Sequence, residues 1–205
     1  MDKKIVITIA RGYGSGGKTI GKMLSKELDI PYYDREILYM ASDESGINLN
    51  LFQKNDENVN KSLFDSKNHK YEGDLIPPED SDFVSKENLF NYQAKIIRDL
   101  AEKESCIIVG RCADFILKDM ENTLNLFIWA PHDVCVKTVM DMYSFSEKDA
   151  EKKVRKIDRH RSDYYRYYTG RNWDDVRNFD LCLNTADKTY EECVEIIKAY
   201  INIIK

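Results

Sequence analysis

The sequence predicts an α/β fold in which a parallel sheet lies between two layers of helices. Short, β-branched apolar runs alternate about five times along the 205 residues with longer segments whose apolar residues recur at helical spacing. Strand–helix–strand units of this kind close with parallel strands. We also find no internal repeat and no linker that would divide the chain, so residues 1–205 are expected to form a single domain.

The expected elements follow one another from the N-terminus. Strands are expected at residues 4–10, 31–33, 106–110, 124–129 and 179–183, because these are the short apolar runs. Helices are expected at residues 18–28, 35–42, 87–104, 111–120, 131–143, 146–168 and 189–205. Ser146 is a suitable N-cap for its helix, and Pro131 suits a first helical turn.

Two segments differ from the rest of the chain in charge. Residues 43–87 contain 11 acidic and 5 basic side chains, are rich in Asn, Asp, Lys and Ser, and include Pro77 and Pro78. This composition predicts a loop-rich, mobile insert. Residues 152–171 contain 8 basic and 2 acidic side chains. They fall in an expected helix, which would therefore present a basic face without acidic partners.

The overall composition excludes several classes of protein. A net charge of −5 argues against a general nucleic-acid-binding protein. No apolar stretch reaches about 18 residues, so no membrane span is expected, and the first residues do not resemble a signal peptide. The five cysteines form no Cys-x-x-Cys pair and the three histidines are scattered. We therefore expect reduced thiols, a cytoplasmic location and no metal centre built from these residues.

The most informative motif is the glycine-rich stretch Gly12-Tyr13-Gly14-Ser15-Gly16-Gly17-Lys18-Thr19. It satisfies the pattern G-x-x-x-x-G-K-[ST] and lies between an expected buried strand and the start of a helix. The glycines let successive backbone amides converge on phosphate oxygens at the positive end of that helix. Lys18 would neutralise charge on the β- and γ-phosphates of ATP, and Thr19 would hold Mg²⁺. We therefore predict a phosphate-binding loop at residues 12–19.

The arginines distinguish between the classes of protein that carry such a loop. The apolar strands end in Gly110-Arg111 and Ala130-Pro131, so neither supplies the carboxylate that hydrolytic motors use to hold Mg²⁺, and no Asn-Lys-x-Asp guanine motif is present. Phosphoryl transfer instead needs cations around the transferred group. Arg111 follows a buried strand directly, and the basic segment supplies Arg155, Arg159 and Arg161. This pattern favours a kinase with an arginine-rich helical lid over residues 150–172.

The stretches "GYGSGGKTIG", "IPYYDREIL", "IIVGR", "DRHRSDYYRYYTGRNW" and "FDLCLNT" together resemble the cytidylate kinase-like branch of the nucleoside monophosphate kinases. The resemblance covers nearly the whole chain outside residues 47–85. It implies a three-layer P-loop kinase fold, in which a five-stranded parallel sheet of order 2-3-1-4-5 has helices on both faces and an arginine-rich helical lid. It also implies ATP and Mg²⁺ as cofactors, and an insert at 43–87 on the side of the phosphate acceptor.

The same resemblance implies roles for individual residues. Asp34 and Arg35 would lie near the monophosphate acceptor, and Arg111 would hold its phosphate. Asp158, Arg159 and Arg161 match the lid pattern that clamps the donor and the transferred group, and Asn184 and Thr185 fall in the loop that lies against adenine. The stretch "DREILYM" departs from the "DSGAIYR"-like stretch of well-characterised bacterial cytidylate kinases, so the residues that read cytosine are not identifiable from the sequence.

Three functions are consistent with these patterns. The first is ATP-dependent phosphoryl transfer to a nucleoside monophosphate, with CMP or dCMP as the favoured acceptor. The second is a P-loop kinase acting on another small metabolite, and the third is a non-catalytic nucleotide-binding sensor or accessory protein, which the acidic insert would suit. We expect small-molecule nucleotides as partners, and neither nucleic acid nor a membrane; the sequence leaves the oligomeric state open.

Overall fold

The computed structural model of the protein describes residues 4–57, 71 and 73–204. Within them, β1 (Val6–Arg11), β2 (Tyr32–Tyr33), β3 (Cys106–Val109), β4 (Thr123–Trp129) and β5 (Leu181–Asn184) form one sheet. The strand order is β2-β3-β1-β4-β5, and each neighbouring pair is parallel. The expected fold class, strand order and strand direction are therefore confirmed.

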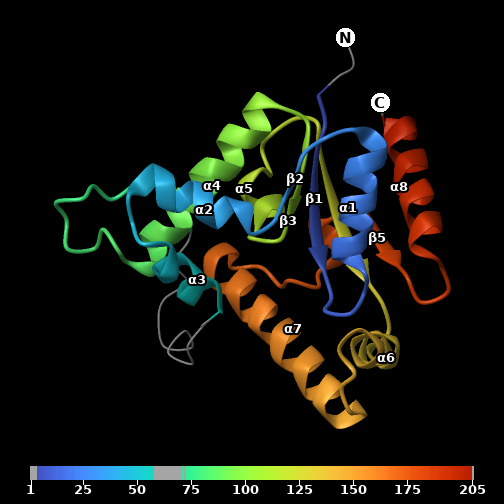
Figure 1. Ribbon diagram of the computed structural model, residues 1–205. Helices are drawn as coiled ribbons and strands as arrows, with labels where there is room; N and C mark the ends of the chain where they lie inside the picture. The colour runs from blue at the N-terminus through green and yellow to red at the C-terminus, as the bar shows by residue number, and fades with distance from the viewer. Residues whose placement is uncertain (1–3, 58–70, 72, 205) are drawn as a thin grey trace.

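Helices cover both faces of this sheet. On one face lie α1 (Gly17–Leu28) and α8 (Tyr190–Ile204), and on the other lie α2 (Glu36–Ser45), α4 (Lys86–Lys103) and α5 (Ala113–Ile116) (Figure 1). The central strand β1 is buried on both sides because its side chains alternate between two apolar clusters. Ile7 and Ile9 belong to the cluster beneath α1 and α8, whereas Val6 belongs to the cluster beneath α2 and α4.

The structure corrects two of the expected elements. Helix α5 is limited to Ala113–Ile116, although a helix was expected over residues 111–120. The segment expected to be a loop-rich insert contains helix α3 (Leu49–Glu57), whose Phe52 is fully buried in the cluster beneath α2 and α4. Residues 58–70 and 72 of that insert lie outside the described residues, so the mobility of the insert stays a prediction.

The helices α6 (His132–Tyr143) and α7 (Glu147–Thr169) form a hairpin that projects beyond the carboxyl ends of the strands (Figure 1). The N-terminal half of α7 packs on α6 through Val154 and Ala150. Its C-terminal half belongs to the main core, where Tyr165 is buried and Tyr168 stacks on Phe90 of α4 with ring centroids 3.9 Å apart. The expected lid over residues 150–172 therefore includes residues that pack in the core, and its role as a lid stays a prediction.

Three further observations concern the thiols, metal binding and membrane insertion of the described residues. All five cysteines are free thiols, and four of them are buried. No group of three His, Cys, Asp or Glu side chains in the described part of the chain could hold a metal ion. Across residues 4–57 and 73–204 we also find no helix that combines the length and the apolar composition needed to span a bilayer.

Candidate active site

The glycine-rich loop connects the carboxyl end of β1 to the N-terminus of α1, at the edge of the sheet where the strands end (Figure 1). Ligands of open α/β sheets bind at this edge. The backbone of the loop is left-handed at two positions, because Gly14 and Gly16 have φ values of +89° and +81°. A methyl group on Gly14 would lie 2.5 Å from the carbonyl oxygen of Cys135, and one on Gly16 would overlap the ring of Tyr190. Both positions therefore require glycine.

The remaining residues of the loop fix its shape. The buried Ser15 hydroxyl lies 2.9 Å from the carbonyl oxygen of Gly12 and 3.0 Å from that of Ile128. Gly17 begins α1 beneath the side chain of Arg11. Lys18 and Thr19 follow with exposed side chains at the first turn of the helix, where helix dipole and free amides favour an anion. The loop thus has the strand–loop–helix geometry that a phosphate-binding loop requires.

Lys18 pairs with Asp34, which lies just beyond β2. The Lys18 Nζ is 2.5 Å from Oδ2 of Asp34, and Nη2 of Arg11 is 3.9 Å from Oδ1. Burial alone would raise the pKa of Asp34, but the hydrogen bond from Lys18 and the charges of Arg11, Lys18 and Arg111 together hold this pKa below its ordinary value. Asp34 is therefore a carboxylate that organises cations. Arg35, by contrast, is exposed at the start of α2.

Arg111 approaches Asp34 from β3 through an unusual turn. Gly110, Arg111 and Cys112 all have positive φ, at +78°, +57° and +56°. Consecutive left-handed residues are costly outside glycine, and such strain is concentrated at functional sites. The turn aims a buried guanidinium back across the ends of the strands. Its Nε donates to the carbonyl oxygen of Asp34 and its Nη1 to Oε1 of Gln93, both at 2.9 Å.

Helix α7 brings Asp158 and Arg161 to the loop. The amide of Tyr13 donates to Oδ1 of Asp158 (2.8 Å), and Nη1 of Arg161 donates to the carbonyl oxygen of Arg11 (2.9 Å). The Arg161 guanidinium also lies 5.6 Å from the centre of the Tyr13 ring. Burial, followed by the positive charge of Arg11, lowers the pKa of Arg161, and burial raises the pKa of Asp158. Both residues are therefore part of the loop's immediate surroundings.

The other two lid arginines lie away from this cluster. Arg155 pairs with Glu151 at 2.8 Å and Arg159 lies 3.9 Å from Asp163, with 67% and 76% of these two arginine side chains exposed. The expectation that the basic helix lacks acidic partners is wrong, because Glu151 and Asp163 lie one turn away on the same helix. Of the arginines expected in the lid, the structure brings Arg161 to the loop and leaves Arg155 and Arg159 facing solvent.

On the opposite side of the loop, the expected adenine-binding residues follow β5. The Thr185 hydroxyl donates to the carbonyl oxygen of Ser15 at 3.0 Å, and Asn184 Oδ1 accepts from the amide of Ala186. The Thr185 amide also bonds to the end of β4. The segment after β5 is thereby joined to the phosphate-binding loop, on the side of the sheet away from Asp34.

Two residues of the site were not identified from the sequence. Arg11, the last residue of β1, extends its side chain towards Asp34 with 14% of it exposed. Gln93 of α4 is buried and accepts from Arg111. Arg11 precedes the first glycine of the motif directly, which is a signal that sequence inspection could have used. Gln93 carries no comparable signal, because an isolated Gln on a helix is ordinary.

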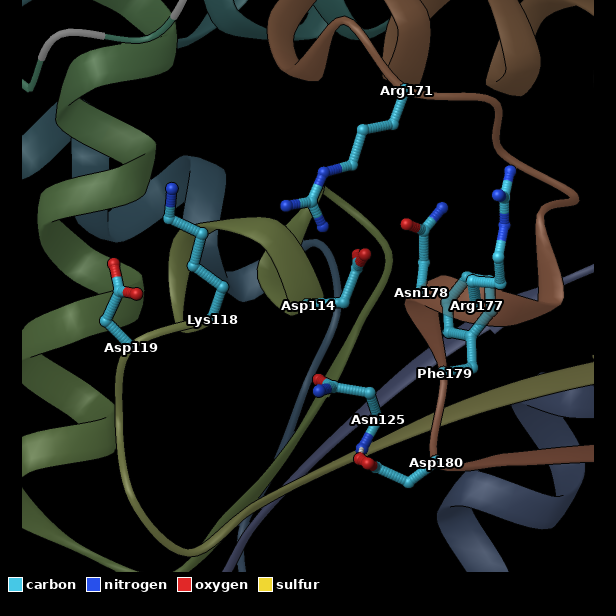
Figure 2. A pocket seen from close by; sticks show the side chains of 9 residues that line it. All are labelled: Asp114, Lys118, Asp119, Asn125, Arg171, Arg177, Asn178, Phe179 and Asp180. Atoms are coloured by element: carbon cyan, nitrogen blue, oxygen red, sulfur yellow. Dashed lines mark hydrogen bonds between the residues drawn. The ribbon is translucent and has the colours of Figure 1, made fainter.

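A separate pocket of about 440 Å³ lies against the early part of β4 (Figure 2). Its lining contains charges of both signs from the segment after β3 and from residues 171–180: Asp114, Lys118, Asp119, Asn125, Arg171, Arg177, Asn178, Phe179 and Asp180. None of these residues belongs to the glycine-rich loop, and Arg177 is paired with Asp175. The pocket is therefore distinct from the candidate active site.

Comparison with known proteins agrees with this geometry. The model of the cytidylate kinase-like family matches residues 6–187. The chain belongs to the cytidylate kinase-like family. It is 24% identical over 204 residues to a cytidylate kinase of Sulfurisphaera tokodaii, covering 98% of this chain and 97% of that protein. It is also 24% identical to a cytidylate kinase of Pyrococcus horikoshii, covering 97% and 89% of the two chains.

Solved structures place this cytidylate kinase-like chain among the P-loop kinases in fold. An uncharacterised protein from Eubacterium ventriosum superposes with a TM-score of 0.71 at 28% identity, covering 97% of this chain and 99% of that one. A shikimate kinase from Bacteroides thetaiotaomicron has a TM-score of 0.54 at 12% identity, with 97% and 98% covered. The second likeness concerns the fold alone, so family and fold together indicate a phosphotransferase that uses a nucleotide.

Proposed function

We propose that this protein transfers the γ-phosphoryl group of ATP to the phosphate of a nucleoside monophosphate, with CMP or dCMP as the acceptor. The observation that carries the proposal is the group of cationic side chains at the carboxyl edge of the sheet, where Lys18, Arg111 and Arg161 lie around the loop and Asp34. Cations in such a group stabilise the charge on transferring phosphoryl groups. The family and its curated relatives support the choice of acceptor.

The state of the carboxylates favours a phosphate acceptor over an alcohol. Phosphoryl transfer to a hydroxyl group is accelerated by a general base that removes the hydroxyl proton and whose pKa lies near neutrality. Asp34 is ion-paired to Lys18 and its pKa is lowered, which makes it a weak base. Burial raises the pKa of Asp158, but its Oδ1 is occupied by the Tyr13 amide and lies 3.5 Å from Nη1 of Arg161, so this carboxylate is committed to the loop. An acceptor phosphate is already anionic at neutral pH and needs no base, so it suits these surroundings.

The residues present also fit ATP with Mg²⁺. Thr19 is exposed in the first turn of α1, next to Lys18. Mg²⁺ in such sites is held by few protein oxygens, since phosphate oxygens and water supply the remaining ligands. Thr19 would therefore contribute one ligand, and the metal would neutralise charge on the β- and γ-phosphates. Asn184 and Thr185 would face the adenine at the other end of the nucleotide.

The proposal is tested by following ADP release with ATP, Mg²⁺ and each of the eight nucleoside and deoxynucleoside monophosphates. We expect turnover with CMP and dCMP and little with the purine nucleotides. Turnover with none of the eight, by protein that binds ATP, would contradict the proposal. A screen of hydroxylated and phosphorylated metabolites would then identify a kinase of another acceptor, and ATP that stays intact throughout would indicate a nucleotide-binding sensor.

A further inference from the structure

Arg11 occupies a position at the centre of the sheet that the proposed function leaves unassigned. It ends β1 and pairs in register with Ile128 of β4, while β3 lies on the other side of β1. Its side chain does not follow the loop towards α1. Instead the guanidinium lies over the end of β3, with Nη2 3.9 Å from Oδ1 of Asp34.

Two glycines make room for this side chain. A methyl group on Gly17 would lie 2.6 Å from Cβ of Arg11, and a methyl group on Gly110 would overlap Nη1 of its guanidinium. Gly17 belongs to the loop motif, but Gly110 lies outside it and has a φ of +78°. The end of β3 is therefore shaped to admit an arginine side chain from β1, which places the guanidinium beside the turn that carries Arg111.

The strand order determines which substrate this guanidinium faces. The nucleotide of a phosphate-binding loop extends from Lys18 towards the segment after β5, where Thr185 bonds to Ser15. Arg11 points the opposite way, across β3 towards β2 and Asp34. Arg111 converges on the same place, with two of its N–H groups already donated to Asp34 and Gln93. The side beyond β3 is where a second substrate would meet the γ-phosphate.

We propose that the Arg11 guanidinium binds the phosphate group of the acceptor, beside Arg111 and next to the Asp34 carboxylate that also pairs with Lys18. This inference rests on the proposed function, because it assumes a phosphorylated second substrate. A guanidinium matches two phosphate oxygens with its planar pair of N–H groups, which a lysine ammonium cannot reproduce. Arg11 also contributes its backbone, since its carbonyl oxygen holds Arg161.

The experiment compares Arg11→Met and Arg11→Lys with the wild type and with Arg177→Met. Arg177 is a suitable control because its side chain is 84% exposed and forms an ion pair with Asp175, two residues away. Calorimetry measures the binding of CMP and of cytidine to ADP-loaded protein, the binding of ADP, and the thermal unfolding of ligand-free protein. For Arg11→Met we expect CMP affinity to fall about 30- to 100-fold, the loss typical of a charge-assisted hydrogen-bonded pair.

In the same variant we expect cytidine and ADP affinities to stay within about threefold of wild type. Arg11→Lys should lie between wild type and Arg11→Met for CMP, and Arg177→Met should match wild type. An Arg11→Met protein that keeps its CMP affinity would overturn the proposal. An Arg11→Met protein that loses ADP affinity and not CMP affinity would also overturn it. A structural role would instead lower the unfolding temperature of the ligand-free variant while leaving CMP binding intact. A wild type that binds none of the nucleoside monophosphates also overturns it, whereas the turnover assay alone decides the proposed function.

Discussion

Lys18 is expected to matter for activity but not for the stability of the fold. Half of its side chain is exposed, and its contact is with Asp34 at the rim of the site. We expect Lys18→Ala to fold normally and to lose activity by about 10²- to 10³-fold in kcat, the effect typical of removing one group that stabilises transition-state charge. Steady-state kinetics together with thermal unfolding check this outcome. Near-wild-type turnover in a folded variant would contradict the role of Lys18.

Gly14 provides a test of the loop's backbone at the same scale. Gly14→Ala places a methyl group 2.5 Å from the carbonyl oxygen of Cys135 at a φ of +89°. Gly46→Ala is a matched control, because Gly46 has a φ of +71° with open space around it. Gly46→Ala should lower the free energy of unfolding by about 1 kcal/mol through backbone strain alone. Gly14→Ala should cost about 1–3 kcal/mol more, because the clash with backbone adds to the strain.

Denaturant unfolding of the two glycine variants measures this difference directly. If both variants lost the same free energy of unfolding, α6 would be able to move away from the loop at little cost.

At the scale of the elements, α7 offers a comparison between arginines of one helix. Arg161 bonds to the end of β1 and lies over Tyr13, whereas Arg166 is exposed near the C-terminus of the helix. We expect Arg161→Ala to lower kcat by about 10²-fold or more, with a smaller effect on ATP binding. Arg166→Ala should stay within about threefold of wild type. Equal kinetics in the two variants would remove Arg161 from the site.

The contact between α5 and α7 should make stability depend on pH. Asp114 is buried and accepts a hydrogen bond of 2.6 Å from the Tyr165 hydroxyl. Burial raises the pKa of Asp114 from 3.8 to about 6, so the folded state favours the protonated acid. Its contribution to stability is therefore fully present below pH 4 and is lost as the pH rises through 6.

We expect Asp114→Asn to become more stable relative to wild type as the pH rises from 4 to 7, because the amide keeps an acceptor for Tyr165 without ionising. The linked change is on the order of 2–3 kcal/mol. Thermal unfolding of both proteins across this pH range measures it. A difference that is constant with pH would mean that Asp114 has an ordinary pKa in the folded protein.

At the scale of the whole molecule, the sheet was predictable and part of the helical layer was not. The strands follow mainly apolar runs such as "CIIV", and burial of these runs determines where the strands lie. Helix α3 was missed because "LNLFQKNDE" is mostly polar, and the burial of Phe52 stabilises the helix through a contact with distant residues. Local periodicity does not encode such tertiary stabilisation.

Part of the candidate site could likewise be predicted from the sequence and part could not. The glycine-rich loop is contiguous in the sequence, so its residues and its strand–helix setting could be predicted together. Arg11 and Gln93 join the site through partners far along the chain, such as Asp34 for Arg11 and Arg111 for Gln93. The exposure of Arg155 and Arg159 likewise depends on how α7 is docked, which residue spacing does not determine.

The two ends of α7 are held by different parts of the molecule, so a rotation of the helix would move its residues by unequal distances. Its last turns are clamped, because Tyr165 is buried and Tyr168 stacks on Phe90, while its first turns rest on α6. Arg161 sits at the fulcrum between the two parts. At 1.5 Å per residue, Arg155 lies about 9 Å from that fulcrum and Glu147 about 21 Å, so a rotation of about 20° would move them roughly 3 Å and 7 Å.

In such a rotation Arg161 would stay in place, Arg159 would move only about 1 Å, and Arg155 would move farther. Spin labels at Lys148 and at Glu195 of α8 would report the swing as a change of several ångström in their separation when ADP and CMP are added. An unchanged separation would mean that the first turns of α7 stay fixed. If the first turns of α7 rotate in this way, Arg161 keeps its contact with the loop while Arg155 changes position, and the order in which the two arginines meet the substrates would follow from their distance to the fixed turns.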